Sequence, residues 1–198
     1  ALRPPAVVAI YDHDEAAPVL ALEYVAGGTL RERLAARAPL PAGEIAETAA
    51  TLFDALAYVH ARGVTHGDLK PSNLLLRAPG AVVLADFGAA ELRDAGHLGE
   101  GPGGTPQYLA PERLHGARPS PATDLYAAGA ILWELAVGRP LRTHADLLRG
   151  QVTPPPFPDD ARRALGPRLT ALVAALIAPE PTSRPSSATF PRTPGWRT

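Results

Sequence analysis

The chain has 198 residues, enough for one domain with a sizeable core, and its 46% hydrophobic and 20% charged residues exclude a disordered protein. A formal net charge of −1 gives no basic surface for nucleic acid or an anionic membrane, so we expect neither as a partner. The lack of cysteine excludes disulfides and thiolate metal sites. The longest apolar stretch, residues 125–137, is too short to span a bilayer, and we expect no membrane segment in these residues.

The first elements are expected to be strands. Two apolar runs rich in β-forming residues, 6–11 and 19–24, flank a polar turn, which predicts a β-hairpin. Two consecutive glycines then interrupt the chain. The sequence TLRE that begins at Thr29 is a capping-box pattern, and it predicts a short helix that ends at about Arg37.

The middle of the chain alternates between helix and strand. Apolar residues recur at helical spacing over 44–62, which predicts the clearest helix of the chain. Residues 74–76 and 82–85 are two short apolar runs joined by an Ala-Pro-Gly turn, and they predict paired strands. Residues 91–104 are polar and rich in glycine, which favours a loop.

The last third is expected to be helical. Residues 124–137 are apolar on nearly every face, which predicts a buried central helix with Asp124 near its N-cap. The sequence PPPFP at 154–158 favours an extended linker, and 168–178 predicts another apolar helix. From residue 186 onward no core pattern is visible, so we expect a disordered tail.

The octapeptide HGDLKPSN at 66–73 contains the chain's sole lysine, Lys70, and its sole asparagine, Asn73. It lies between a predicted helix and a predicted strand, so ordered structure holds it at both ends. Asp68 can accept a proton or orient a hydroxyl group, and Lys70 can neutralise a transferring anion. The amide oxygen of Asn73 is a hard ligand of the kind that Mg²⁺ prefers.

A second oxygen ligand, Asp86, follows at the end of the next predicted strand. A hairpin of this length returns the chain beside the first loop, so Asn73 and Asp86 are expected to face one another across a metal ion. Together with a lysine and a carboxylate base, these groups fit phosphoryl transfer, in which positioning and charge neutralisation supply most of the catalysis.

HGDLKPSN, followed by DFG at 86–88 and GTPQYLAPE at 104–112, resembles the catalytic segment of bacterial serine/threonine protein kinases of the eukaryotic type. The resemblance covers about residues 2–185. It implies an α+β, protein-kinase-like fold with a mainly helical C-terminal lobe and a remnant of the β-rich N-terminal lobe. The implied segments are 1–22 for that remnant, 23–28 for a hinge, 29–185 for the C-terminal lobe and 186–198 for the tail.

The resemblance also assigns roles to the site residues. Asp68 resembles the catalytic base, and Lys70 the lysine that contacts the γ-phosphate of ATP. Asn73 and Asp86 resemble the two Mg²⁺ ligands. Thr105 resembles the threonine that braces Asp68 and Lys70 in the loop that receives the substrate hydroxyl.

The nucleotide side follows from LEYVAGG at 22–28, which resembles the hinge between kinase lobes. The backbone of Glu23 and Val25 would hydrogen-bond adenine, and Leu22 would be the gatekeeper. Leu75 would pack under the adenine ring.

The resemblance further implies three packing relations outside the reacting groups. A hydrophobic spine would be made of Ile10, His66 and Phe87. Asp124 would anchor this spine from below. Glu112 of the APE sequence would pair with Arg184.

The implied function is transfer of the γ-phosphoryl group of ATP to a Ser or Thr hydroxyl of a protein, in the cytoplasm, with any membrane anchor of the parent protein outside these residues. A pseudokinase that acts as a scaffold is one alternative. A small-molecule kinase of the aminoglycoside or choline type is another alternative. Those enzymes also carry an H-G-D loop, which this chain matches because of Gly67, but they lack the DFG and APE sequences.

The N-terminal lobe departs from the family pattern. The sequence has no Gly-rich phosphate loop and no strand lysine of the V-A-I-K type, and it starts at about the fourth strand of that lobe. Lys70 cannot fill both lysine roles. We therefore assign the function to an intact parent protein, and we expect these 198 residues alone to bind ATP weakly and to be inactive.

Overall fold

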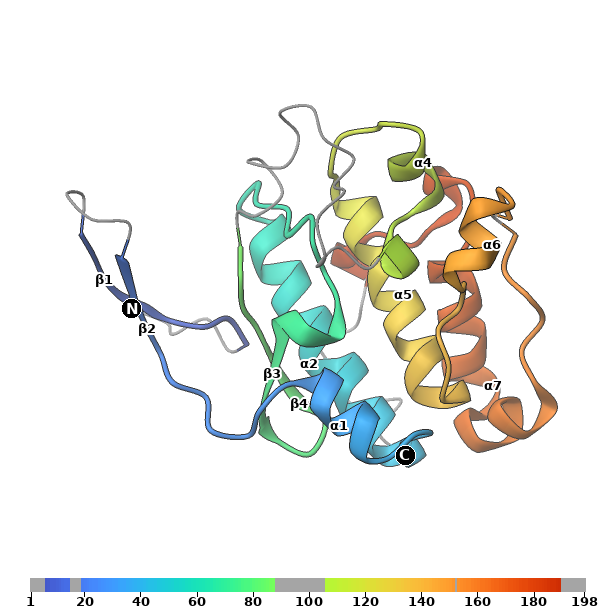
Figure 1. Cartoon of the computed structure of the whole chain (residues 1–198), viewed down its shortest axis with the longest axis horizontal. Helices are drawn as coiled ribbons and strands as arrows, with labels where there is room; N and C mark the ends of the chain where they lie inside the picture. Colours follow the sequence, from blue (N-terminus) through green and yellow to red (C-terminus); the bar gives the residue numbers. More distant parts are fainter. Residues whose placement is uncertain (1–5, 15–18, 88–105, 152, 190–198) are drawn as a thin grey trace.

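The computed structural model of the protein describes residues 6–14, 19–87, 106–151 and 153–189, and most of its elements are helices (Figure 1). The α-helices are α1 Leu30–Ala36, α2 Ala42–His60, α4 Pro111–Leu114, α5 Pro121–Val137, α6 His144–Leu148 and α7 Asp159–Leu176. The strands are β1 Ile10–Asp14, β2 Val19–Leu22, β3 Leu74–Ala78 and β4 Ala81–Leu84. Short 3-10 helices are η1 Pro71–Asn73, η2 Pro106–Tyr108, η3 Pro181–Ser183 and η4 Ser187–Thr189. These elements confirm the predicted α+β class, and the predicted loop at 91–104 lies outside the described residues.

The predicted N-terminal hairpin is confirmed. Strands β1 and β2 pair antiparallel, with Ile10 opposite Leu22, and the hairpin projects away from the helical body (Figure 1). The predicted strand at 6–11 is divided between two pairings, because residues 6–8 pair parallel with β4 instead. Val8 N donates to Leu84 O at 2.9 Å, and Leu84 N donates to Ala6 O at 2.8 Å. Ile10 is 64% exposed, so the expectation that it joins the hydrophobic spine is wrong.

The two glycines before α1 hold the presumed hinge against β3. A Cβ on Gly27 would lie 2.0 Å from the carbonyl oxygen of Leu76, and Gly28 adopts a φ of +73°. The Gly28 carbonyl accepts a hydrogen bond from Leu76 N at 2.9 Å. The predicted capping box then starts α1, with Thr29 Oγ1 accepting from Glu32 N at 3.1 Å and Glu32 Oε2 accepting from Thr29 N at 2.7 Å.

Helix α5 is the centre of the core. It is buried on nearly every face, as its apolar sequence predicts, and packs against both α2 and α7 (Figure 1). The N-cap is Ser120, which forms a capping box with Thr123, so Asp124 lies at the end of the first turn rather than at the cap. A local helix-start pattern places the boundary only to within a few residues.

The chain after α5 returns across the core through the linker and α7. The PPPFP linker is extended as predicted, and its Phe157 packs on Trp133 of α5 with ring centroids 4.3 Å apart. Helix α7 begins nine residues before the predicted helix at 168–178, because Gly166, with a φ of +73°, joins two helical pieces across a kink. The longer helix is amphipathic only in part, which is why the apolar pattern identified its second piece alone.

Substitution of Gly129 is expected to test the packing of α5 on α7. A Cβ at this position would lie 2.7 Å from Leu176 Cβ and 2.8 Å from Ile177 Cγ2, so Gly129→Ala is expected to lower the free energy of unfolding by about 1–3 kcal/mol. Gly43→Ala in α2 is the matched control, since its Cβ would meet no atom within 4 Å and a helical alanine gains about 0.5–1 kcal/mol. Urea unfolding measures the free energy of unfolding of both variants, and equal changes in Gly129→Ala and Gly43→Ala would contradict the packing argument.

Candidate active site

One buried carboxylate fixes the start of the loop at 66–73. Asp124 of α5 is 1% exposed. Its Oδ2 accepts from His66 N at 2.8 Å, and its Oδ1 accepts from Gly67 N at 2.9 Å. Gly67 has a φ of +75°, a left-handed conformation that favours glycine. These backbone donors offset the desolvation of the carboxylate, and the predicted anchoring role of Asp124 toward His66 is confirmed.

The same carboxylate connects the loop to the C-terminal end of the described chain. His60 Nε2 lies 2.9 Å from Asp124 Oδ2, and His60 Nδ1 lies 2.9 Å from Ser187 Oγ. Ser187 is buried in η4, so the disordered tail predicted from residue 186 is wrong for 186–189. The reason is that Ser187 bonds a buried imidazole from α2, a relation that no local sequence pattern contains.

The ring of His66 supports the loop from beneath. Its Nε2 donates to the carbonyl of Ala85 at 3.0 Å, and its Nδ1 accepts from Asp68 N at 3.3 Å. Burial lowers the pKa of His66, which keeps this imidazole neutral and able both to donate and to accept. The ring stacks on Phe87 with centroids 4.8 Å apart, which confirms this part of the predicted spine.

Asp68, Lys70 and Asn73 of the octapeptide converge. Lys70 Nζ lies 2.8 Å from Asp68 Oδ2, and both side chains remain partly accessible. Asn73 Nδ2 donates to the carbonyl oxygen of Asp68 at 2.9 Å and lies 3.4 Å from Asp68 Oδ2. The amide nitrogen of Asn73 is thus turned toward Asp68, and its Oδ1 accepts a long hydrogen bond of 3.5 Å from the Ser72 hydroxyl.

Asp86 follows a residue whose backbone is hydrogen-bonded to this cluster. Ala85 N donates to the carbonyl of Asn73 at 3.0 Å. Asp86, the residue after Ala85, therefore adjoins Asn73, the other predicted metal ligand. Asp86 is exposed and has a φ of +64°, a conformation uncommon for a residue other than glycine. An amide oxygen and a carboxylate are hard ligands that suit Mg²⁺, which commonly completes its shell with water and phosphate oxygens. The residues present therefore fit a magnesium ion.

The residues predicted to hold adenine lie on two neighbouring segments. Glu23 N donates to Ala9 O at 2.9 Å, and the Glu23 carboxylate pairs with Arg77 of β3 at 2.5 Å. Leu22 is 47% exposed, while Val25 and Leu75 are half-buried. Leu75 bridges to Thr29, so β3 lies beside the hinge. Their contacts with a nucleotide remain predictions.

Thr105 lies outside the described residues, and the segment after it, residues 106–111, is held by a network that sequence reasoning missed. Tyr108 OH donates to Glu134 of α5 and accepts from Arg31 of α1. Arg31 Nη1 also donates to Glu134 Oε1 at 2.9 Å. Tyr108 lies 77 positions and Glu134 lies 103 positions after Arg31 in the sequence, and no local pattern reveals contacts over such separations.

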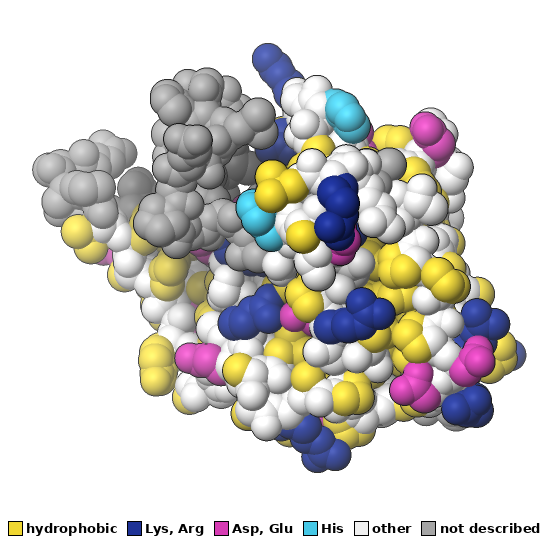
Figure 2. All heavy atoms as spheres, turned by 45° about the vertical axis from the view of Figure 1, so that its right-hand side comes forward, with side chains coloured by type: hydrophobic (Ala, Val, Ile, Leu, Met, Phe, Trp, Pro, Cys, Tyr) yellow, Lys and Arg dark blue, Asp and Glu magenta, His cyan; other side chains and the backbone are white. Residues whose placement is uncertain are grey.

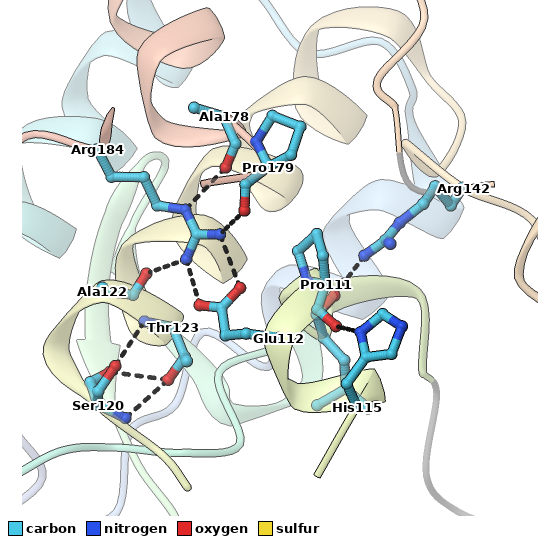
Figure 3. Close-up of polar contacts among 11 residues, drawn as sticks. Pro111, Glu112, His115, Ser120, Ala122, Thr123, Arg142, Ala178, Pro179 and Arg184 are labelled. Carbon is cyan, nitrogen blue, oxygen red and sulfur yellow. Dashed lines mark hydrogen bonds and ion pairs between the residues drawn. The ribbon is translucent and has the colours of Figure 1, made fainter. Parts of the chain in front are cut away.

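The predicted pair of Glu112 and Arg184 is confirmed (Figure 3). Arg184 Nη1 and Nη2 donate to the two carboxylate oxygens at 2.5 and 2.8 Å. The same guanidinium also donates to the carbonyls of Ala122, Ala178 and Pro179 at 2.8–3.0 Å. This set fastens α4 to the start of α5 and to the turn after α7.

A second buried arginine, Arg142, lies close to this pair but is poorly satisfied (Figure 3). It is 1% exposed, and its Nη2 donates to the carbonyl of Leu109. Among the described residues, its Nε and Nη1 have no hydrogen-bond partner, and neither has the hydroxyl of Tyr126, whose ring centroid lies 5.2 Å from the guanidinium. Burial lowers the pKa of Arg142, as expected for a cation that its surroundings stabilise incompletely.

The surface agrees with the low net charge. On the face shown in Figure 2, basic and acidic side chains alternate among hydrophobic and neutral ones without a large field of one sign. Within the described ranges, no helix combines the length and hydropathy required to cross a membrane.

Comparison with known proteins identifies the family. The protein kinase domain family matches residues 2–194, and the chain belongs to this family. It is 34% identical to the serine/threonine-protein kinase PknB of Mycobacterium tuberculosis, over 93% of this chain. It is 36% identical to the serine/threonine-protein kinase Pkn1 of Myxococcus xanthus, over 91% of this chain, and 32% identical to pkn3 of the same organism, over 94%. These relatives confirm the predicted resemblance to bacterial serine/threonine kinases.

The chain spans about a third of the length of these relatives. The matched region is 32% of PknB, 28% of Pkn1 and 38% of pkn3. The family assignment therefore describes the region that aligns, and the activity of a whole protein is a separate question.

Removal of the Glu112 carboxylate is expected to destabilise the fold. Glu112→Gln leaves the guanidinium of Arg184 buried without a counter-charge, and the free energy of unfolding should fall by about 3–5 kcal/mol. Burial by itself would raise the pKa of Glu112, but the hydrogen bonds from Arg184, a backbone hydrogen bond and the charges of Arg184 and Arg142 together hold the pKa below the ordinary value of 4.5. The pair's contribution is thus complete above pH 4.5 and is lost as pH falls through the lower folded-state pKa.

Urea unfolding at several pH values measures both effects. Glu180→Gln, at an exposed position, is the control, and its stability should follow that of the unmodified protein. A Glu112→Gln variant that loses stability below pH 4.5 as steeply as the unmodified protein would contradict the assignment.

Replacement of Arg142 is expected to raise the free energy of unfolding rather than to lower it. Arg142→Met removes a buried cation whose Nε and Nη1 are unpaired, and the free energy of unfolding should rise by about 1–4 kcal/mol. Arg139→Met, at an exposed position nearby, should change it by less than about 0.5 kcal/mol. If urea unfolding shows Arg142→Met to be destabilised, the bond to Leu109 contributes more than the burial costs.

Proposed function

We propose that this domain transfers the γ-phosphoryl group of ATP to a Ser or Thr hydroxyl of a protein substrate. The observation that carries the proposal is the convergence of Asp68, Lys70 and Asn73 in one loop, with Asp86 joined to it through the bond between Ala85 and Asn73. The family membership and the names of the relatives support the same reaction.

In this reaction Asp68 orients the substrate hydroxyl and accepts its proton. Lys70, held 2.8 Å from Asp68 Oδ2, offsets negative charge on the transferring group as it moves toward that hydroxyl. The carbonyl of Asp68 holds the Asn73 side chain in place, so that Asn73 and Asp86 can present oxygen ligands to Mg²⁺. The ion would supply charge neutralisation at the phosphate oxygens.

The remaining roles are proposals on the same basis. Leu22, Glu23, Val25 and Leu75 would contact the adenine of ATP, and Thr105 would brace the catalytic loop. The use of ATP as donor favours a cytoplasmic site of action. A protein is the proposed substrate class, with no role for nucleic acid.

Substitution of the base tests the proposal. In the protein as its own cell produces it, Asp68→Asn should lower the rate of phosphate transfer from ATP by about 10²–10⁴-fold, because the amide cannot accept the proton. Asp54→Asn, at an exposed position of α2, is the matched control and should keep full activity. Transfer of labelled phosphate to protein measures the rate, and thermal unfolding checks that both variants fold.

Two outcomes would overturn the proposal. Undiminished transfer by Asp68→Asn would remove Asp68 from the mechanism. Stabilisation by ATP without any transfer in the unmodified protein would instead favour a pseudokinase.

A further inference from the structure

The network around Tyr108 brings a charged side chain to the segment at 106–111. Arg31 projects from α1, contacts the Tyr108 hydroxyl through Nη2, and places its Cζ 5.8 Å from the centroid of the Tyr108 ring. Its Nη1 reaches Glu134 of α5 at 2.9 Å. One guanidinium thus joins two helices to the segment that follows Thr105.

The carboxylate of this network is not available to an incoming ligand. Glu134 Oε1 accepts from Arg31, and Glu134 Oε2 accepts from the Tyr108 hydroxyl. The Glu134 side chain is only 6% exposed. Burial is the largest factor that raises the pKa of Tyr108, so the phenol stays neutral and adds no negative charge.

The cation of the network, by contrast, reaches the surface. The side chain of Arg31 is 41% exposed. A guanidinium carries five N–H donors, and the bonds to Tyr108 and Glu134 use two of them. A ligand that approaches residues 106–111 from solvent therefore meets positive charge and donors that no other described residue occupies, with the compensating carboxylate beneath them.

The neighbouring charges on α1 do not offset this. Glu32 is engaged in the capping box at Thr29, with its Oε2 accepting from Thr29 N at 2.7 Å. Arg33 is paired with Glu44 of α2 at 2.7 Å. Arg31 is the charged residue of α1 that is directed to the segment at 106–111.

We infer that Arg31 is a specificity-determining residue that favours a protein substrate with an acidic side chain near the accepting hydroxyl and disfavours a basic one. This rests on the proposed function, in which Thr105 braces the loop that receives the substrate hydroxyl, so that residues 106–111, which directly follow Thr105, would adjoin the substrate. The exposed N–H groups of Arg31 donate to a substrate carboxylate, and a guanidinium and a carboxylate match in geometry. Because Glu134 is already occupied, a substrate lysine or arginine finds no partner in this network.

Matched peptides with one central Ser or Thr, flanked by Glu, Gln or Lys, test the inference. Both kcat/KM for phosphate transfer and Kd for binding, by fluorescence anisotropy, are measured in the protein as its own cell produces it. The unmodified protein should prefer the Glu peptide to the Lys peptide by about twofold to fivefold, the range of a partly exposed ion pair. The preference should reside in KM rather than kcat and shrink at about 0.5 M salt.

Three variants separate specificity from support of the fold. Arg31→Gln keeps a donor for Tyr108 but loses the charge, so the ratio of Glu to Lys peptides should fall to about one. Arg31→Lys keeps the charge and should retain the preference. Arg33→Gln, on the same helix but directed to Glu44, is the control and should also retain it. Thermal unfolding confirms that each variant folds.

The outcomes distinguish this inference from the proposed function. Equal use of the Glu and Lys peptides by the unmodified protein, or an unchanged ratio in Arg31→Gln, would overturn the role of Arg31. Binding that depends on Arg31 in a protein that transfers no phosphate would support the specificity site while overturning the proposed reaction.

Discussion

The buried carboxylate of Asp124 is the interaction on which the rest of the site depends. It lies in α5, the most buried of the helices that the structure describes, and holds the backbone N–H groups of His66 and Gly67. Because such a group is costly to bury without donors, the loop conformation that supplies these donors is strongly favoured over others. The position of Asp68, one residue further along the chain, follows from this anchoring.

Helix α5 also contacts other parts of the structure at successive positions along its length. Asp124 holds the loop at 66–73, Gly129 allows the close approach of α7, and Glu134 holds Tyr108. The spacing of five residues places these three positions on different sides of the helix, so that a single rigid element orients three surrounding parts. A rigid support of this kind is what a reaction that depends on positioning requires.

The arginines of the site differ in how completely they are satisfied. Arg184 donates to Glu112 and to three carbonyls, whereas Arg142 is also buried but leaves Nε and Nη1 without a partner among the described residues. Arg31 is shared between Glu134 and solvent. The three therefore differ in their surroundings: Arg184 joins α4 to α5, Arg142 holds the carbonyl of Leu109, and Arg31 remains partly exposed to solvent.

The sequence by itself determined the α+β class, the capping box at Thr29, the buried nature of α5 and the convergence of Asp68, Lys70 and Asn73, because hydrophobic periodicity, capping chemistry and motif spacing are local properties. Only the tertiary structure decided the exposure of Ile10, the bond that connects Ser187 through His60 to Asp124, and the network of Arg31, Tyr108 and Glu134. These features join residues 26 to 127 positions apart, or depend on which surfaces remain uncovered, and such relations are set by the packing of distant elements rather than by any stretch of sequence.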